Sequence, residues 1–177
     1  QSFPCSFDFR FYKDIYIVKT NLNGGVVFQE TYGGKFLEKG MDIVSKGNGD
    51  GYMVLGQQCK HRYDIFSCGP ITKVMILDID ENGNNLDQTF LGGLKFYEFG
   101  TPMALANTSN DGYVFATNPR NGGNVWLYKW GDYENNLNLK ISPGGFGGES
   151  IEKTLDNGFI ISTGGGTVLK TDSQLSY

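Results

Sequence analysis

The sequence predicts an all-β fold made of short antiparallel strands joined by tight turns. Three observations lead to this prediction. The 177 residues include 26 glycines but only three alanines, Ala104, Ala106 and Ala116. Aromatic residues make up 14% of the chain and charged residues only 19%, a composition typical of strands and turns. Asn-Gly and Asp-Gly dipeptides recur between apolar stretches, as they do in β-hairpins.

The order of these elements repeats along the chain, and this repetition is the strongest signal in the sequence. In each repeat an apolar segment ends at a double glycine, and a second glycine turn then precedes an aromatic strand. The double glycines stand at 33–34, 92–93 and 144–145, and the turn glycines are Gly51, Gly112 and Gly158. The spacing is irregular, but the order of elements does not change.

Each repeat predicts four strands, with three full units at 14–56, 73–117 and 124–164. A partial unit at 167–177 is joined by an N-terminal strand at 7–11. The predicted strands span 15–20, 26–32, 41–45, 52–55, 74–78, 86–91, 103–106, 113–117, 125–129, 137–141, 151–155, 159–163 and 167–171. Four-stranded antiparallel meanders repeated at about 40–60 residues are the sequence mark of propeller blades. We therefore predict one β-propeller-like domain over residues 1–177.

Three segments carry a resemblance to a known group of proteins. They are Thr31-Tyr32-Gly33-Gly34, Asp50-Gly51-Tyr52-Met53-Val54-Leu55-Gly56 and Leu77-Asp78-Ile79-Asp80-Glu81-Asn82-Gly83. Over about residues 14–171 the chain resembles secreted and cell-surface β-propeller repeat proteins. The resemblance implies a propeller fold and an extracellular setting, but it implies no reaction. The third unit departs from the pattern, because residues 131–136 replace the short turn and Pro143 precedes the double glycine.

Composition and repeat number indicate the class of function. The net charge is −4 without a lysine or arginine cluster, which disfavours nucleic-acid binding, and the chain has no apolar run long enough to span a membrane. A closed propeller needs about four blades, which leaves three alternatives: a fragment of a longer protein, a small distorted ring, or terminal strand edges that pair with copies of the same chain. We predict a non-catalytic extracellular structural or interaction protein that assembles into a polymer or filament.

Two other functions stay open at this point. The first is a cell-surface propeller module that binds carbohydrate or protein. The second is a hydrolase or lyase on a propeller scaffold, which the sequence disfavours because it offers no convergent set of acids and bases. The single histidine, His61, lies in the loop between two cysteines, away from any nucleophile motif.

The cysteines and one sequon point to secretion. Cys59 and Cys68 bracket a short segment and are predicted to form a disulfide, the alternative being two free thiols. Cys5 has no evident partner, and one histidine with two cysteines makes a poor zinc site. The sequon Asn107-Thr108-Ser109 falls on a predicted turn, so Asn107 is a predicted glycosylation site.

A calcium loop is the one candidate for a bound cofactor. Asp78, Asp80 and Asn82 place oxygen atoms at alternate positions before a turning glycine, as calcium loops do. Thr89 stands where the closing bidentate glutamate would be. The alternative is an ordinary Asn-Gly hairpin, which the other repeats favour because they lack these acids.

Three further groups of residues have a functional and a structural interpretation. Glu38, Glu98 and Glu149 each follow a double glycine, and we favour a buried acceptor in each blade over a ring of channel carboxylates. The glycine-rich segment 144–148 is interpreted as a blade loop instead of a phosphate cradle. The aromatic cluster of Trp126, Tyr128, Trp130 and Tyr133 is expected in the core, with stacking of Trp126, Trp130 and Tyr133 on sugar rings as the alternative.

Overall fold

The computed structural model describes residues 13–34, 36–47, 49–59, 72–92, 100–109, 112–118, 124–131, 138–141 and 147–176. Within these residues the regular structure consists of β-strands, which confirms the predicted all-β class. The strands are β1 Ile15–Thr20, β2 Val26–Tyr32, β3 Leu37–Ser45, β4 Tyr52–Cys59, β5 Thr72–Ile79, β6 Asn85–Leu91, β7 Thr101–Asn107, β8 Tyr113–Asn118, β9 Trp126–Trp130, β10 Asn138–Ile141, β11 Gly148–Lys153, β12 Phe159–Thr163 and β13 Val168–Thr171. The predicted strand at 7–11 lies outside the described residues.

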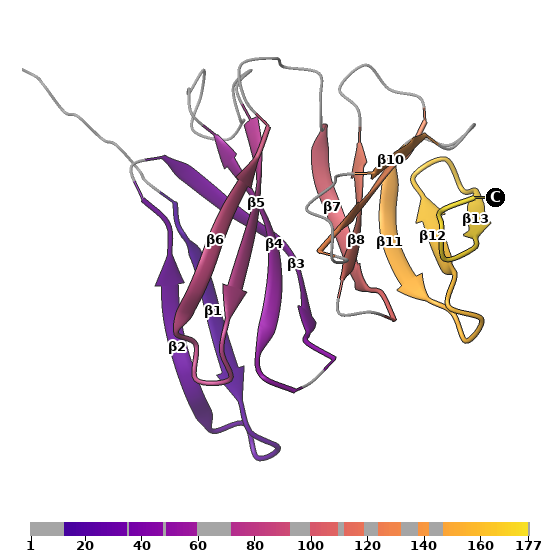
Figure 1. The fold of residues 1–177 in the computed structure, drawn as a ribbon. Helices are drawn as coiled ribbons and strands as arrows, with labels where there is room; N and C mark the ends of the chain where they lie inside the picture. The colour runs from indigo at the N-terminus through magenta and orange to yellow at the C-terminus, as the bar shows by residue number, and fades with distance from the viewer. Residues whose placement is uncertain are drawn as a thin grey trace, which may run out of the picture.

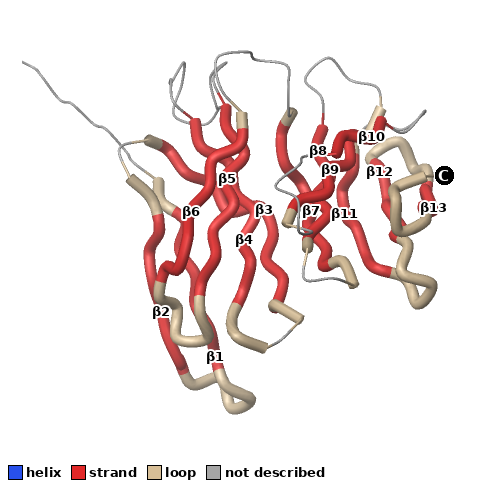
Figure 2. The backbone as a smooth tube through the Cα atoms, viewed as in Figure 1, coloured by secondary structure: helices blue, strands red, loops and turns tan. Residues whose placement is uncertain are grey.

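The strands form four antiparallel sheets that lie side by side along the chain (Figures 1 and 2). The sheets are β1–β2, β3–β6, β7–β10 and β11–β13, in sequence order. The predicted grouping of strands was wrong, because the units at 14–56, 73–117 and 124–164 each divide between two sheets. Each complete sheet takes its first two strands from one unit and its last two from the next.

The double glycines connect sheets instead of joining strands within a sheet. Gly33 and Gly34 lead from β2 to β3, which belong to different sheets. A side chain at position 33 would place its Cβ 2.3 Å from Asp14 Oδ1, so any larger residue there would displace the Asp14 side chain. The four-stranded antiparallel meander is correct for β3–β6 and β7–β10, but it begins two strands later than predicted.

Equivalent turns follow β1, β5 and β13. At Asn21, Asp80 and Asp172 the side-chain Oδ1 accepts the backbone N–H groups two and four residues later at 2.8–2.9 Å. The fourth residue of each turn has positive φ, and in the third turn it is Leu175 at 61° instead of glycine. Side chains of Asn and Asp favour this geometry because they hydrogen-bond their own turn.

The cores lie between neighbouring sheets, and each inner sheet contributes to two of them. Alternate residues of a strand point to opposite faces, so β8 sends Tyr113 and Phe115 toward β3–β6 and Val114 and Ala116 toward β11–β13. The three core clusters are Ile15, Phe28, Tyr32, Val54, Met75, Leu77 and Ile79; then Met53, Leu55, Val74, Ile76, Leu105, Tyr113, Phe115 and Tyr128; then Ala104, Ala106, Val114, Ala116, Val125, Leu127, Ile151, Phe159, Ile161 and Leu175.

Candidate functional site

The cysteine prediction is partly within the described structure. Cys59 ends β4, is buried, and is disulfide-bonded. Cys68 and Cys5 lie outside the described residues, as does His61, so the pairing of Cys59 with Cys68 stays a prediction. Glu98 and Tyr133 also lie outside, as do residues 144–146 of the glycine-rich segment.

Two of the three predicted calcium ligands, Asp78 and Asp80, have other side-chain partners. The Asp80 carboxylate accepts the backbone N–H groups of Asn82 and Asn84 and the Asn84 side-chain amide, each at 2.8–2.9 Å. These hydrogen bonds hold the pKa of Asp80 below its ordinary value, with the Asn84 side chain as the largest cause. Asp78 forms an ion pair with Lys46. The segment forms the hairpin turn between β5 and β6. Among the described residues no group of three or more His, Cys, Asp or Glu side chains is placed to bind a metal, and calcium binding at this turn stays a prediction.

Asn107 is the last residue of β7, and Thr108 and Ser109 of the sequon follow it outside the strand. Its Nδ2 donates a hydrogen bond to the Ser45 carbonyl oxygen of the neighbouring sheet at 2.7 Å. The Asn107 Oδ1 is buried and has no hydrogen-bond partner. The nitrogen that a glycan would modify is thus engaged in a contact between sheets.

Two of the three predicted stacking residues pack against a core. Trp126 and Trp130 are half-buried against the second core cluster, and Tyr128 between them is fully buried. The Tyr128 ring stacks on Phe115 with centroids 5.1 Å apart. These contacts agree with the interpretation that Trp126, Tyr128 and Trp130, which alternate along β9, belong to the core.

Glu38 and Glu149 are not equivalent, which corrects the repeat assignment. Glu38 is buried and accepts hydrogen bonds from Gln58 Nε2 at 2.8 Å and from the Gly34 N–H at 3.4 Å. Burial is the main cause that raises its pKa above 4.5. Glu149 is exposed and is the extra residue of a β-bulge in β11, a position that Met41 and Met103 occupy in β3 and β7.

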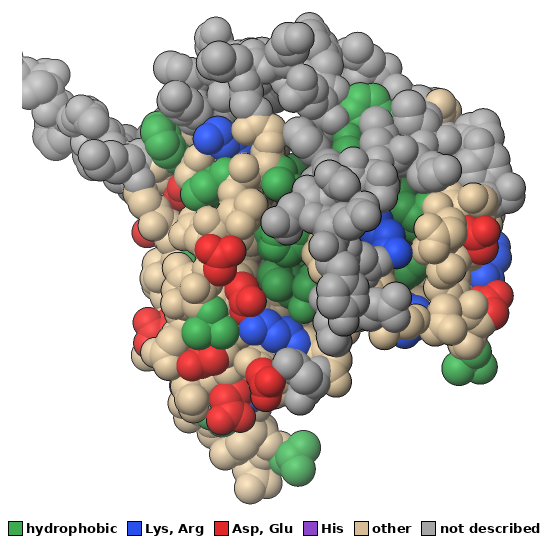
Figure 3. Space-filling view, viewed as in Figure 1, with side chains coloured by type: hydrophobic (Ala, Val, Ile, Leu, Met, Phe, Trp, Pro, Cys, Tyr) green, Lys and Arg blue, Asp and Glu red, His purple; other side chains and the backbone are tan. Residues whose placement is uncertain are grey.

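Charged side chains pair locally, and on the face shown in Figure 3 acidic and basic groups are interspersed among uncharged ones. Lys170 Nζ lies 2.9 Å from Asp156 Oδ2. The Thr154 hydroxyl and then Lys170 hold the pKa of Asp156 below its ordinary value. Lys19 Nζ lies 5.4 Å from the Tyr52 ring centroid, within the range of a cation–π contact.

A groove that the sequence did not indicate lies where the first strands of three sheets converge. It has a volume of about 560 Å³ and is lined by residues of β3, β7 and β11, together with Gly47 and Thr108. Two side chains connect the strands there. Asp42 Oδ2 accepts the Leu105 N–H at 2.8 Å, and Asn107 bonds to Ser45. We call this pair the β3–β7 latch.

A second groove lies along the edge of β1 that faces away from β2. It has a volume of about 360 Å³ and is mostly apolar. Its lining residues are Ile15, Tyr16, Ile17, Val18, Gly40, Met41, Asp42, Ile43 and Val54. Among the described strands β1 pairs only with β2, so none of them pairs with its other edge, which lies beside this apolar surface.

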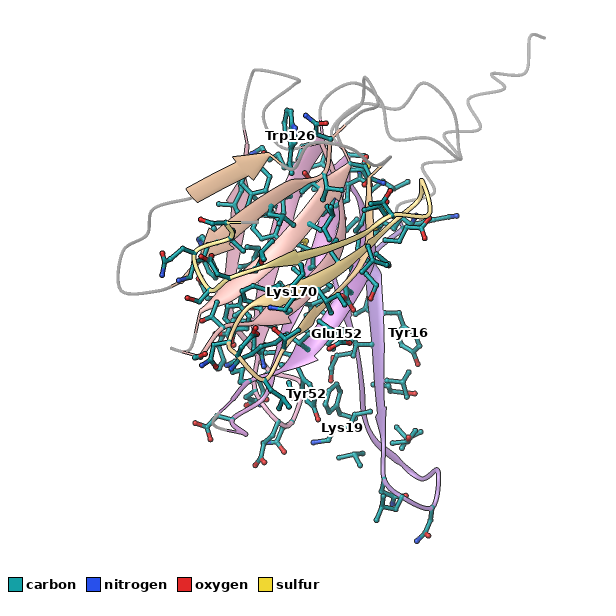
Figure 4. All side chains as sticks on the ribbon, turned by 90° about the vertical axis from the view of Figure 1, so that its right-hand side faces the viewer. Tyr16, Lys19, Tyr52, Trp126, Glu152 and Lys170 are labelled. Atoms are coloured by element: carbon teal, nitrogen blue, oxygen red, sulfur yellow. The ribbon has the colours of Figure 1, made fainter. Side chains whose placement is uncertain are left out.

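The first and last sheets each present one uncovered face. On β1–β2 this face carries Tyr16 and Val18, and on β11–β13 it carries Ile160 and Val168, all of them exposed. A row of Glu152, Ile160 and Lys170 crosses the last sheet in register. Figure 4 labels Glu152 and Lys170 on this sheet and Tyr16 on the hairpin at the other end. We call the two surfaces the N-face and the C-face.

Comparisons with known proteins bear on the fold. Neither a family model nor a curated protein matches the sequence. Among solved structures, the chain is similar to Kuenenia stuttgartiensis hydrazine synthase, with a TM-score of 0.66 and 15% sequence identity. The match covers 94% of this chain and 54% of the hydrazine synthase chain, so this chain spans about half the length of that protein chain. At this identity the likeness supports the fold and carries no activity. Within the described part of the chain, no helix is long and apolar enough to cross a membrane.

Proposed function

We propose that the chain is a non-catalytic extracellular interaction module with a propeller-like stack of sheets, and that copies associate head to tail through the N-face and the C-face. The propeller-like arrangement is supported by four-stranded sheets that pack face to face, with their first strands together at one groove. The extracellular setting is supported by the disulfide bond at Cys59, because such bonds persist mainly in oxidising compartments.

One observation carries the proposed association: the end sheets place apolar residues at positions that inner sheets bury. By register, Tyr16 and Val18 of β1 correspond to Met75 and Leu77 of β5. Met75 and Leu77 are both 0% exposed, because they contact the preceding sheet. Tyr16 and Val18 are 60% and 43% exposed. An apolar face that is covered in one sheet and open in its equivalent marks a contact surface.

The C-face shows the same relation on the opposite side of the stack. Ile160 and Val168 correspond by register to Met53 and Ile76, which are buried against the next sheet. Ile160 is 40% exposed and Val168 is 63% exposed. Because the N-face and the C-face are opposite surfaces, their contact is heterologous and builds rings or filaments.

The test uses variants that block one face at a time. Light scattering over a wide concentration range is expected to show association of the native chain, and Val18→Lys and Val168→Lys are each expected to stop growth. Leu22→Lys and Leu155→Lys add the same charge at fully exposed turn residues outside both faces, and they should assemble normally. A mixture of the two face variants should stop at a heterodimer, because one intact face remains on each chain.

The results separate the alternatives clearly. A native chain that stays monomeric at the highest concentration contradicts the proposal. If the turn variants block assembly as strongly as the face variants, the loss reflects added charge and the two faces are not the contact.

A second function, ligand binding, is favoured by the groove between β3, β7 and β11. Its volume falls within the range of about 300–1,000 Å³ that is usual for small-molecule pockets. Its lining includes Ser150 and Glu152, which are exposed and carry acceptor oxygens, so a ligand with N–H or O–H donors suits this site. A Thr108→Val variant that left the binding of every donor-bearing sugar or amine in a screen unchanged would count against this use of the groove.

A further inference from the structure

The hairpin β1–β2 is the outer half of a sheet. Its turn at Asn21 has the same side-chain hydrogen bonds as the turn at Asp80 between β5 and β6. The register also shifts at the same place, between Lys19 and Thr20 in β1 and between Asp78 and Ile79 in β5. β1 therefore holds the position of a third strand, and β2 that of a fourth.

In every other sheet the third strand pairs with a second strand, which in the two four-stranded sheets lies on the side away from the fourth strand. β5 pairs with β4, β9 with β8 and β13 with β12. The corresponding edge of β1 has no partner among the described strands. The apolar groove lies along this edge, with Met41 and Ile43 of β3 as its other wall.

The second strands define what fits this edge. β4, β8 and β12 each begin with an aromatic residue after a glycine turn and continue with at least two consecutive apolar residues. Their aromatic residues, Tyr52, Tyr113 and Phe159, pair with the last residue of the third strand. At β1 that last residue is Thr20, so the register of an added strand is defined.

We propose that the free edge of β1 is a strand-acceptor site. It binds an extended segment of a partner polypeptide with the pattern glycine, aromatic residue and then at least two consecutive apolar residues. The segment pairs antiparallel to β1, with its aromatic residue opposite Thr20, and its apolar side chains lie against Ile43. Main-chain hydrogen bonds then supply affinity and the groove supplies specificity, as in other cases of strand addition. This inference rests on the proposed interaction function and places a contact at the N-terminal end of the stack of sheets.

The test measures peptide binding to the full chain. The probe is a fluorescent synthetic peptide that copies residues 111–118, which include β8, and its control is a scrambled peptide of the same composition. Hydrogen exchange read by mass spectrometry is expected to show protection of residues 15–20 only with the first peptide. Two further peptides carry N-methyl groups on alternate backbone nitrogens, so that each blocks the N–H groups on one edge of the peptide strand. Only the peptide that is methylated on the edge facing β1 should lose binding.

Matched variants locate the site on the chain. Ile43→Lys, in the groove wall, is expected to weaken binding at least about tenfold, equivalent to about 1.4 kcal/mol. Leu86→Lys places the same charge at an exposed apolar residue of β6 outside the groove and should bind normally. Loss of binding in both variants, or equal binding of the scrambled peptide, would overturn the proposal.

The outcome is distinguishable from failure of the proposed function. If copies associate in light scattering but no peptide protects β1, face-to-face stacking stands and strand addition is rejected. If the peptide protects β1 but the native chain stays monomeric, the acceptor site stands and the self-association is rejected.

Discussion

Replacing Asp42 by alanine is expected to destabilise the fold by about 1–3 kcal/mol, because the β3–β7 latch then loses its charged acceptor. Asp42 Oδ2 accepts the Leu105 N–H at 2.8 Å across two sheets. Leu105 is buried, and β7 is the edge strand of its sheet, so this N–H has no strand beside it to replace the carboxylate. The loss combines a hydrogen bond to a charged group with the cost of a buried, unsatisfied donor.

The assay is urea unfolding followed by tryptophan fluorescence, since Trp126 and Trp130 pack in the core on the β7–β10 sheet. Asp42→Asn keeps an oxygen acceptor and should lose less stability than Asp42→Ala. Asp87→Ala removes an exposed carboxylate that accepts a hydrogen bond from the Thr89 hydroxyl, and it should change stability by no more than about 0.5 kcal/mol. Equal effects of Asp42→Ala and Asp87→Ala would refute the assignment of the latch.

Two further predictions concern buried groups. Burial raises the pKa of Glu38 above 4.5, so its folded form binds the proton more tightly and its contribution to stability is lost as pH rises through the folded pKa. Glu38→Gln should therefore gain stability relative to the native chain between about pH 4 and about pH 7, and a constant difference in urea midpoint would contradict this sign. Phe115→Ala removes the ring stacked on Tyr128 and should cost about 3–5 kcal/mol, with Phe115→Leu milder. A loss below about 1 kcal/mol in urea unfolding would show that the site is not tightly packed.

Local signals were sufficient to predict the strands. The predicted segments at 15–20, 26–32 and 159–163 coincide with β1, β2 and β12. In these strands apolar residues either alternate with polar ones or follow one another without a break. Each strand is next to a turn whose side chains accept backbone hydrogen bonds. Both properties depend on neighbours in the chain, so they can be read without the tertiary structure.

The pairing of strands into sheets depends on contacts that local signals do not contain. Residues 60–71 separate β4 from β5, which form a hairpin despite this long connection. The short Gly33-Gly34 connection instead separates two sheets. Short connections usually join neighbouring strands of a sheet, and this preference misplaced the boundaries by two strands.

The candidate sites were harder to predict, because a repeat can be aligned in more than one way. Glu38 and Glu149 both stand four residues after a double glycine, but Glu38 lies 13 residues before its turn glycine and Glu149 only nine. An alignment of the repeats on the turn glycines Gly51 and Gly158, instead of on the double glycines, would have shown that the two glutamates are not equivalent. The β3–β7 latch gave no sequence signal, since Asp42 and Asn107 meet only when two sheets pack.

The charges on the C-face are compatible with a covered surface, as one equivalent position shows. Lys170 occupies the register position of Asp78 in β5. Asp78 lies on the side of its sheet that faces the next sheet, and its charge is balanced by Lys46. Lys170 is balanced in the same way by Asp156, with the signs reversed. Because a locally paired charge already lies at the edge of an inner contact, the pair at Lys170 does not prevent another sheet from covering Ile160 and Val168.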